Sequence, residues 1–179
     1  MISEIRYEVL PKYINYDLPS IFLAGPTVRG NQPHLTSWRF AAIEEFKKRK
    51  FHGNLIIPEF SDKMESDEVR YDLPLWEFDG LKRCDVIMFW IPRTRELIGL
   101  TTNHEMGYWM ARDRNRNKVI YGRPKDAYRV SYLDIMWVED YKDYTDSNIG
   151  PSIYTTLGKT VEASINLAHH CNKELVFES

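Results

Sequence analysis

One uninterrupted apolar run constrains the fold more than any other segment: Asp85–Ile91, with the sequence Asp-Val-Ile-Met-Phe-Trp-Ile. Pro92 closes the run, and apolar and polar residues do not alternate within it. A strand with one face in water would alternate, so this strand is expected to be covered on both faces. Such strands are typical of parallel sheets with helices on both sides, and the run therefore predicts an α/β fold.

Further apolar strands alternate with amphipathic helices, which is the pattern of a doubly wound, mostly parallel α/β sheet. The other predicted strands are Ile21–Gly25, Leu55–Pro58 and Lys118–Tyr121, and the predicted helices are Ser37–Arg49, Leu75–Cys84 and Glu105–Arg112. Additional strands are expected at Ile135–Val138 and, on an edge of the sheet, near Ile5–Leu10.

Two helices carry recognisable apolar sides. In the first helix this side is predicted to contain Trp38, Ala41, Ala42, Ile43 and Phe46. In the last helix a stripe recurs at steps of three or four residues through Ile153, Leu157, Val161, Ile165 and Ala168. Such a stripe either covers the sheet or serves assembly with another chain.

Bulk properties limit the function classes. The 179 residues fit one domain spanning residues 1–179, and the net charge of −2 argues against binding to a nucleic-acid polymer. Only Cys84 and Cys171 occur, without metal-ligand spacing, so we expect a reducing compartment and no metal site. Because no run approaches the ~20 apolar residues of a membrane helix, we expect a cytoplasmic protein without membrane contact.

Ligands of doubly wound sheets bind at the carboxyl ends of the strands, which selects the predicted loops 25–34, 59–74 and 92–104. In the first loop, Gly25 and Pro26 directly follow a strand, and a glycine there lets the backbone approach a ligand closely. Arg29 and the start of the next helix favour an anion. An ordinary tight turn between strand and helix fits the same pattern equally well.

Glu105 stands at the predicted start of the third helix. Thr102 and Glu105 have the spacing of a capping box, a structural role that spacing alone favours. The same placement would let the positive end of the helix dipole keep the carboxylate ionised, which suits a nucleophile. Both interpretations use the same local geometry.

Glu77 and Asp79 lie on the helix that leads into the strand at residues 85–91. Two residues that are two positions apart on a helix do not face the same way, so at most one of them points into a cleft. A second carboxylate opposite Glu105 would supply the pair that glycosidic chemistry uses. Taken singly, each residue is more typical of a solvated helix surface.

Five segments follow one another in a distinctive order: Ile21–Gly25, Trp76-Glu77 followed by Leu81, Cys84–Met88, Ile91-Pro92 and His104–Tyr108. In this order and spacing the chain resembles the nucleoside 2-deoxyribosyltransferase family over roughly residues 21–140. The resemblance implies a flavodoxin-like fold with a five-stranded sheet, no cofactor and a homo-oligomer. It also implies that the partners are a deoxynucleoside or deoxynucleotide and a free nucleobase.

The resemblance assigns a role to each candidate residue. Glu105 takes the place of the glutamate that attacks the anomeric carbon and forms a deoxyribosyl ester, and Glu77 takes the place of an aspartate that assists the base. The family tyrosine that hydrogen-bonds the nucleophile is replaced by Phe22, so another group must orient Glu105, and Tyr108 is a candidate. The predicted substrate-binding residues are Gly25, Pro26, Arg29, Phe22, Asn103 and Tyr108.

A related branch of the family hydrolyses deoxynucleoside 5'-monophosphates and carries an arginine in its glycine loop, as this chain does at Arg29. The replacement at Phe22 also suits a non-catalytic nucleotide-binding module of the same fold. Three functions therefore stay open: deoxyribosyl transfer to another base, hydrolysis, and binding without turnover.

Overall fold

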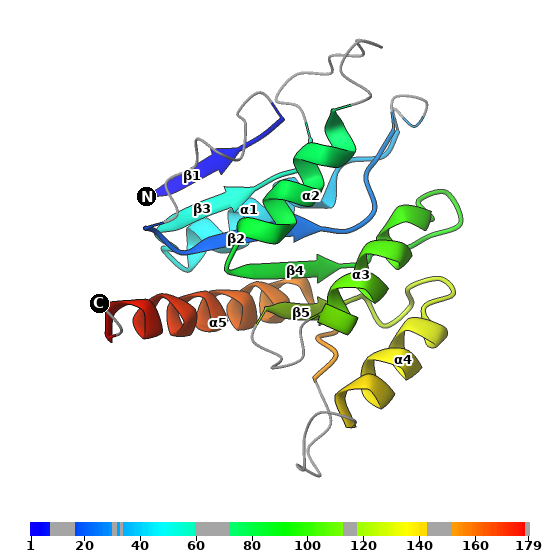
Figure 1. Cartoon of the computed structure of the whole chain (residues 1–179). Coiled ribbons are helices and arrows are strands. Elements are labelled where there is room, and N and C mark those ends of the chain that lie inside the picture. The colour runs from blue at the N-terminus through cyan, green and yellow to red at the C-terminus, as the bar shows by residue number, and fades with distance from the viewer. Residues whose placement is uncertain are drawn as a thin grey trace.

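The computed structural model describes residues 1–7, 17–29, 32, 34–59, 72–112, 118–142 and 152–177. Within these residues, five strands form one sheet in the order β1-β3-β2-β4-β5, with helices on both faces (Figure 1). The strands are β1 (Ile2–Ile5), β2 (Ser20–Ala24), β3 (Gly53–Ile56), β4 (Val86–Trp90) and β5 (Val119–Gly122). The helices are α1 (Trp38–Lys48), α2 (Leu73–Arg83), α3 (Leu100–Arg112), α4 (Ser131–Lys142) and α5 (Leu157–Phe177).

The apolar run forms β4, whose five residues are all buried. Successive side chains of a strand point to opposite faces, so β4 contributes to both layers of the core. Ile87 and Phe89 pack with side chains of α2, α3 and α4, whereas Val86 and Met88 pack with side chains of α1 and α5. The prediction of a strand covered on both faces is confirmed.

All four strand pairings in the sheet are parallel. The sheet thus has the doubly wound, flavodoxin-like architecture that the sequence predicts. Parallel strands bring their carboxyl ends to one edge of the sheet, which is the right-hand edge in Figure 1. The segments that follow β1, β2, β3 and β4 therefore leave from the same side of the molecule.

The fifth strand is β1 and not Ile135–Val138, a prediction that is wrong. Residues 135–138 belong to α4, where Leu133 and Trp137 are buried and Ile135 and Met136 are exposed. A buried spacing of four residues fits a helix, whereas a strand would alternate. The predicted edge strand exists, but it lies at Ile2–Ile5; residues 8–10 of the predicted range lie outside the described residues.

The third helix begins at Leu100, five residues before the predicted start. Gly99, with a φ of 62°, directly precedes it and supplies a backbone conformation that other residues rarely adopt. A side chain at residue 99 would also press against Pro26, which lies in the loop after β2. The start of α3 is therefore fixed by close contact with that loop.

The apolar stripe of the last helix packs on the sheet. Val161 and Ala168 are fully buried against the α1 side of the core, together with the partly buried Leu157 and Ile165. Ile153, predicted to belong to this stripe, precedes α5 (Leu157–Phe177) and packs with the opposite side of the core. The stripe is thus occupied within the chain, which removes it as a surface for assembly. Among the described helices, none has the length and apolarity required to cross a lipid bilayer.

Candidate active site

Two carboxyl groups meet at the carboxyl edge of the sheet, one from α2 and one from α3. Glu77 and Glu105 share a hydrogen bond between their side chains. Burial, followed by the charge and hydrogen bond of Glu77, raises the pKa of Glu105 from its usual 4.5 to about 8, while the Arg39 guanidinium lowers it less. Glu105 therefore retains a proton near neutral pH, beside the carboxyl group of Glu77.

This environment corrects two predictions about Glu105. Because α3 begins at Leu100, Glu105 lies in the second turn, where the helix dipole is weak, and burial opposes its ionisation. The predicted capping box is also wrong, because Thr102 lies inside the helix and is 1% exposed. The position of the carboxyl group beside Glu77 thus has no helix-capping explanation.

The helix α2 approaches the sheet closely at Gly80. A Cβ atom there would lie 3.0 Å from the Phe22 ring on β2, so a larger residue would push the helix outward. This close approach brings Glu77, one turn earlier, to the edge of the sheet. Asp79 points elsewhere and pairs with Arg83 at 2.8 Å on the surface, so only one of the two predicted acids faces Glu105.

Tyr7 lies just beyond β1 and contacts the carboxyl pair. Its hydroxyl donates a hydrogen bond to Oε1 of Glu77, and its ring packs edge-on against Trp76 with 4.9 Å between ring centroids. Burial, then the charge of Glu77, raises the pKa of the Tyr7 hydroxyl far above its usual range. The hydroxyl therefore stays protonated and acts as a donor.

Side chains of α1 hold the loop after β2 through hydrogen bonds to its carbonyl groups. The Arg39 guanidinium donates to the carbonyl oxygens of Leu23 and Gly25, both at 3.0 Å, and the Trp38 indole donates to that of Pro26 at 2.9 Å. A side chain at Gly25 would collide with Trp90 and Trp38, and its φ of 149° also favours glycine. The carbonyl groups of this loop are thus committed to α1.

Arg39 carries the positive charge that holds this loop and the end of β3 together. It is 1% exposed, its guanidinium pairs with Glu59 at 2.8 Å, and it also donates to the Thr27 hydroxyl at 3.2 Å. Glu59 follows β3, and Ser37 donates a second hydrogen bond to it. One buried ion pair therefore joins the ends of β2 and β3 to the start of α1.

The other predicted substrate-binding residues are dispersed around this centre. Arg29 is exposed in the loop after β2, and its backbone amide donates to Gln32. Phe22 is 2% exposed and packs in the core beside Trp76, so little of its ring is available to a base. Tyr108 packs against Phe78 of α2 and beneath the Arg112 guanidinium, and within the described part of the chain it makes no hydrogen bond to Glu105.

Asn103 faces away from the carboxyl pair. Its side-chain oxygen accepts a hydrogen bond from Arg93, a 5% exposed arginine after β4 that also donates to the carbonyl of Arg129 at 3.3 Å. Asn103 and Glu105 are two positions apart on α3, so their side chains point in different directions. The structure thus groups Glu77, Glu105 and the loop from Gly25, but places Asn103 on the other side of α3.

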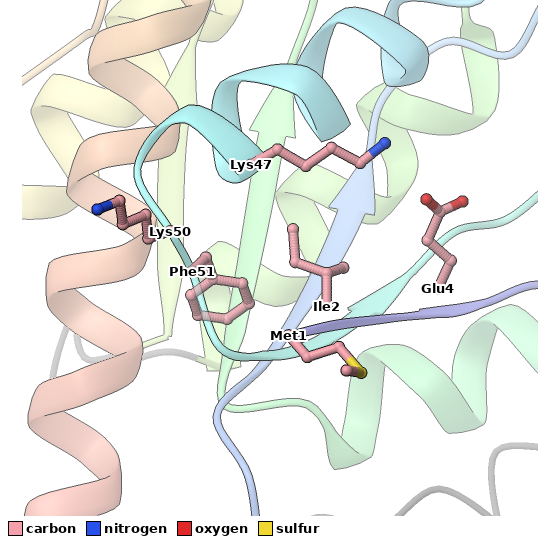
Figure 2. A pocket seen from close by; sticks show the side chains of 6 residues that line it. All are labelled: Met1, Ile2, Glu4, Lys47, Lys50 and Phe51. Atoms are coloured by element: carbon pink, nitrogen blue, oxygen red, sulfur yellow. The ribbon is translucent and has the colours of Figure 1, made fainter.

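A cavity of about 300 Å³ lies at the opposite, amino edge of the sheet. Residues at the start of the chain, at the end of α1 and in the connection from α1 to β3 line it, and the ammonium groups of Lys47 and Lys50 point away from each other (Figure 2). It has no converging polar groups like those around Glu105. Among the described residues, no three His, Cys, Asp or Glu side chains cluster as metal ligands.

Two residues of the site, Arg39 and Tyr7, escaped the sequence analysis. Arg39 has helical spacing with the buried Ala42, Ile43 and Phe46, whereas the predicted Ala41 is exposed. A charged residue on a buried stripe indicates a partnered charge, so this signal was present. Tyr7 offered a weaker signal, namely an aromatic residue directly after a possible edge strand.

The chain matches a known protein family over more than half of its length. No curated protein matches the chain. The family model described as nucleoside 2-deoxyribosyltransferase like matches residues 18–123, which include β2, the loop from Gly25, the carboxyl pair and β5. The match covers more than half of the 179 residues, and the chain therefore belongs to the nucleoside 2-deoxyribosyltransferase-like family.

Proposed function

We propose that the protein cleaves the N-glycosidic bond of a 2'-deoxynucleoside and transfers the sugar to another base, with Glu105 as the nucleophile. The observation that carries this proposal is the hydrogen-bonded pair of Glu77 and Glu105 at the carboxyl edge of the sheet. Two carboxyl groups in one partly buried site suit glycosidic chemistry, in which one group attacks carbon and the other moves a proton.

The one proton held by the carboxyl pair is enough to protonate the departing base, so both halves of the reaction balance. Glu77 accepts the proton from Glu105 and passes it to the departing base. The carboxylate of Glu105 then attacks C1' of the sugar, and the electron pair of the C1'–N bond leaves with the base. The positive charge that develops on the sugar in the transition state is stabilised by the adjacent carboxylate.

In the second half, a nitrogen of the incoming base attacks C1', and the ester bond to Glu105 breaks with its electron pair returning to the carboxylate. The proton of the incoming base returns to the pair through Glu77. No group outside the pair is consumed, which is consistent with a reaction that needs no cofactor. Retention of configuration at C1' follows from two successive displacements.

The decisive assay incubates the protein with a deoxynucleoside and a different free base, and follows both by chromatography. Glu105→Gln is expected to lower turnover by about 10⁴-fold or more, and Glu77→Gln by about 10²- to 10⁴-fold. Asp79→Asn is the matched control on α2, because Asp79 pairs with Arg83 on the surface. Exchange that persists in Glu105→Gln would refute the nucleophile assignment.

Hydrolysis of a deoxynucleoside 5'-monophosphate is the second candidate. The loop after β2 supports it, because the exposed Arg29 offers a cation there, and Arg39 and Trp38 hold the carbonyl groups of Gly25 and Pro26, which would otherwise repel an anion. Release of free base without exchange, dependent on the 5'-phosphate and lost in Arg29→Ala, would identify this activity. Tight binding without turnover would instead identify a binding module.

A further inference from the structure

The N-terminal strand reaches the same edge of the sheet as the carboxyl pair. β1 pairs in parallel with β3, with Ile5 opposite Ile56, and the amide of Ile57 donates to the Ile5 carbonyl at 2.7 Å. Tyr7 follows two residues later, where its amide approaches the carbonyl of Glu59 at 3.5 Å. The register of an edge strand thus fixes where Tyr7 leaves the sheet.

The aromatic rings at this edge aim the Tyr7 hydroxyl at Glu77. The ring meets Trp76 edge-on at an interplanar angle of 70°, and Trp76 is the neighbour of Glu77 on α2. Trp76 is 5% exposed, so it forms a fixed wall against which the tyrosine rests. With Oε1 of Glu77 engaged by the hydroxyl, that carboxyl group is held in one orientation while it hydrogen-bonds Glu105.

Phe22 and Tyr7 both flank Trp76, but only Tyr7 carries a hydroxyl. The Phe22 ring centroid lies 6.3 Å from that of Trp76, and the Phe22 ring is buried in the core against α2. Tyr7 lies outside residues 18–123, the part of the chain that matches the family. The donor at this site therefore comes from the segment after β1, which the family match does not include, and its acceptor is Glu77 instead of Glu105.

The charges around the hydroxyl come from α2, from α1 and from the residue that follows β3 by three positions. Glu77 of α2 and Glu59 after β3 oppose loss of the Tyr7 proton, whereas Arg39 of α1 favours it. Glu77 also opposes ionisation of Glu105 on α3, and Arg39 favours it. Tyr7 is thus a neutral donor facing a carboxylate, and a hydrogen bond from such a donor stabilises the ionised form of its acceptor.

We propose that Tyr7 is a positioning residue for the pair: its hydroxyl, carried to the site by β1, fixes Glu77 and stabilises its ionised form, so that the shared proton starts on Glu105 and passes through Glu77 to the departing base. This inference rests on the proposed function for its role in turnover. The arrangement itself, a tyrosine that sets the protonation of a carboxyl pair, can be tested without any substrate.

The direct test titrates the glutamate side chains by ¹³C NMR in the full chain. Tyr7→Phe keeps the ring against Trp76 and removes only the hydroxyl. The lower titration step of the pair is expected to move to higher pH by about one to two pH units, the amount that a hydrogen bond to a charged group is worth. Tyr132→Phe, which removes an exposed hydroxyl on α4, is the matched control and is expected to leave both steps unchanged.

A second variant separates positioning from a general effect on folding. In a Glu77→Gln background the hydroxyl no longer faces an anion, so adding Tyr7→Phe is expected to leave the titration of Glu105 unchanged. An unchanged lower step in Tyr7→Phe alone, or an equal shift in both backgrounds, would overturn the proposal. These readouts hold even if the protein transfers no sugar, so failure of the proposed function is recognised separately.

Kinetics then tests the role in turnover. Tyr7→Phe is expected to lower kcat by about tenfold to a hundredfold with little change in KM, and to move the acidic limb of the pH profile in the same direction as the titration. A KM effect with an unmoved pH profile would contradict proton positioning. Wild-type protein that turns over no deoxynucleoside would remove the proposed function and leave the titration to decide on Tyr7.

Discussion

Two buried arginines, Arg39 near Glu105 and Arg93 bound to Asn103, differ in what they face. Arg39 pairs with the Glu59 carboxylate and donates to two carbonyl groups and a hydroxyl, whereas Arg93 donates to Asn103 and to one carbonyl and leaves its Nε without a described partner. Burial lowers the pKa of Arg93, which has no carboxylate among its described contacts. The charged network therefore belongs to the side of α3 that carries Glu105.

This difference teaches that burial alone does not mark an active site. Both arginines are almost completely buried, yet only Arg39 acts on the electrostatics of Glu105 and Tyr7. Arg93 instead ties the end of β4 to α3 and to the segment before α4 through neutral acceptors. Substitutions on the two sides should consequently differ in size and in kind.

The largest effect is expected for Arg39→Met. The substitution leaves Glu59 without its cation and several acceptors without a donor, so the free energy of unfolding should fall by about 3–5 kcal/mol. Urea titration measures this value. Arg39→Lys keeps the charge but loses the fork of donors, and it should recover only part of the loss. A loss below about 1 kcal/mol in Arg39→Met would contradict the distinction drawn between the two arginines.

The second effect is a dependence of the free energy of unfolding on pH, which arises from the raised pKa of Glu105. Because the pKa of Glu105 rises from 4.5 unfolded to about 8 folded, the folded state retains a proton that the unfolded state releases. The resulting stabilisation is fully present below about pH 4.5 and is lost as the pH rises to about 8. Unfolding measured across this range should show a negative slope, and Glu105→Gln should flatten it.

A smaller effect is expected for Arg93→Met. The variant loses hydrogen bonds to neutral acceptors but also removes the penalty of burying a cation, so the free energy of unfolding should fall by about 1–2 kcal/mol. Urea titration beside Arg39→Met makes the comparison direct. An equal loss in the two variants would indicate that a carboxylate pairs with Arg93 in solution.

The smallest effect on stability and turnover is expected for Asn103→Ala, although the family resemblance predicts that Asn103 binds substrate. Its side chain points towards Arg93, so stability should fall by about 1 kcal/mol and kcat/KM for sugar transfer by less than about tenfold. Steady-state kinetics beside Glu105→Gln provides the measurement. A loss of kcat/KM comparable to that of Glu105→Gln would place substrate on both sides of α3.

The sequence predicted the architecture because hydrophobic patterning acts locally. The run that forms β4 and the stripe of α5 each carry their own period, and the structure confirms both. The start of α3 could not be read in the same way, because it depends on contact between Gly99 and Pro26, which are distant in sequence. The strand prediction at residues 135–138 was wrong because their β-branched and apolar composition suits a strand, while their burial follows the spacing of a helix.

The candidate site was predictable only in part for a similar reason. Glu105 and Glu77 stand out by their place relative to the strands, but their shared proton depends on tertiary burial. Tyr7 reaches Glu77 across seventy positions of sequence, and only the register between β1 and β3 brings it there. Local patterns find the acids, whereas packing determines which group orients them.

The position of β1 at the edge of the sheet has a consequence for how the protein works over time. An edge strand of four residues, held by one neighbour, belongs to the least protected part of a sheet and opens more often than β2 or β4. Each opening would withdraw Tyr7 from Glu77, so the fraction of molecules in which Tyr7 holds Glu77 equals the closed fraction of β1. Hydrogen exchange at the β1 amides would then report the population in which Tyr7 holds Glu77, and temperature or a ligand that tightens this strand would change that population without touching the carboxyl pair.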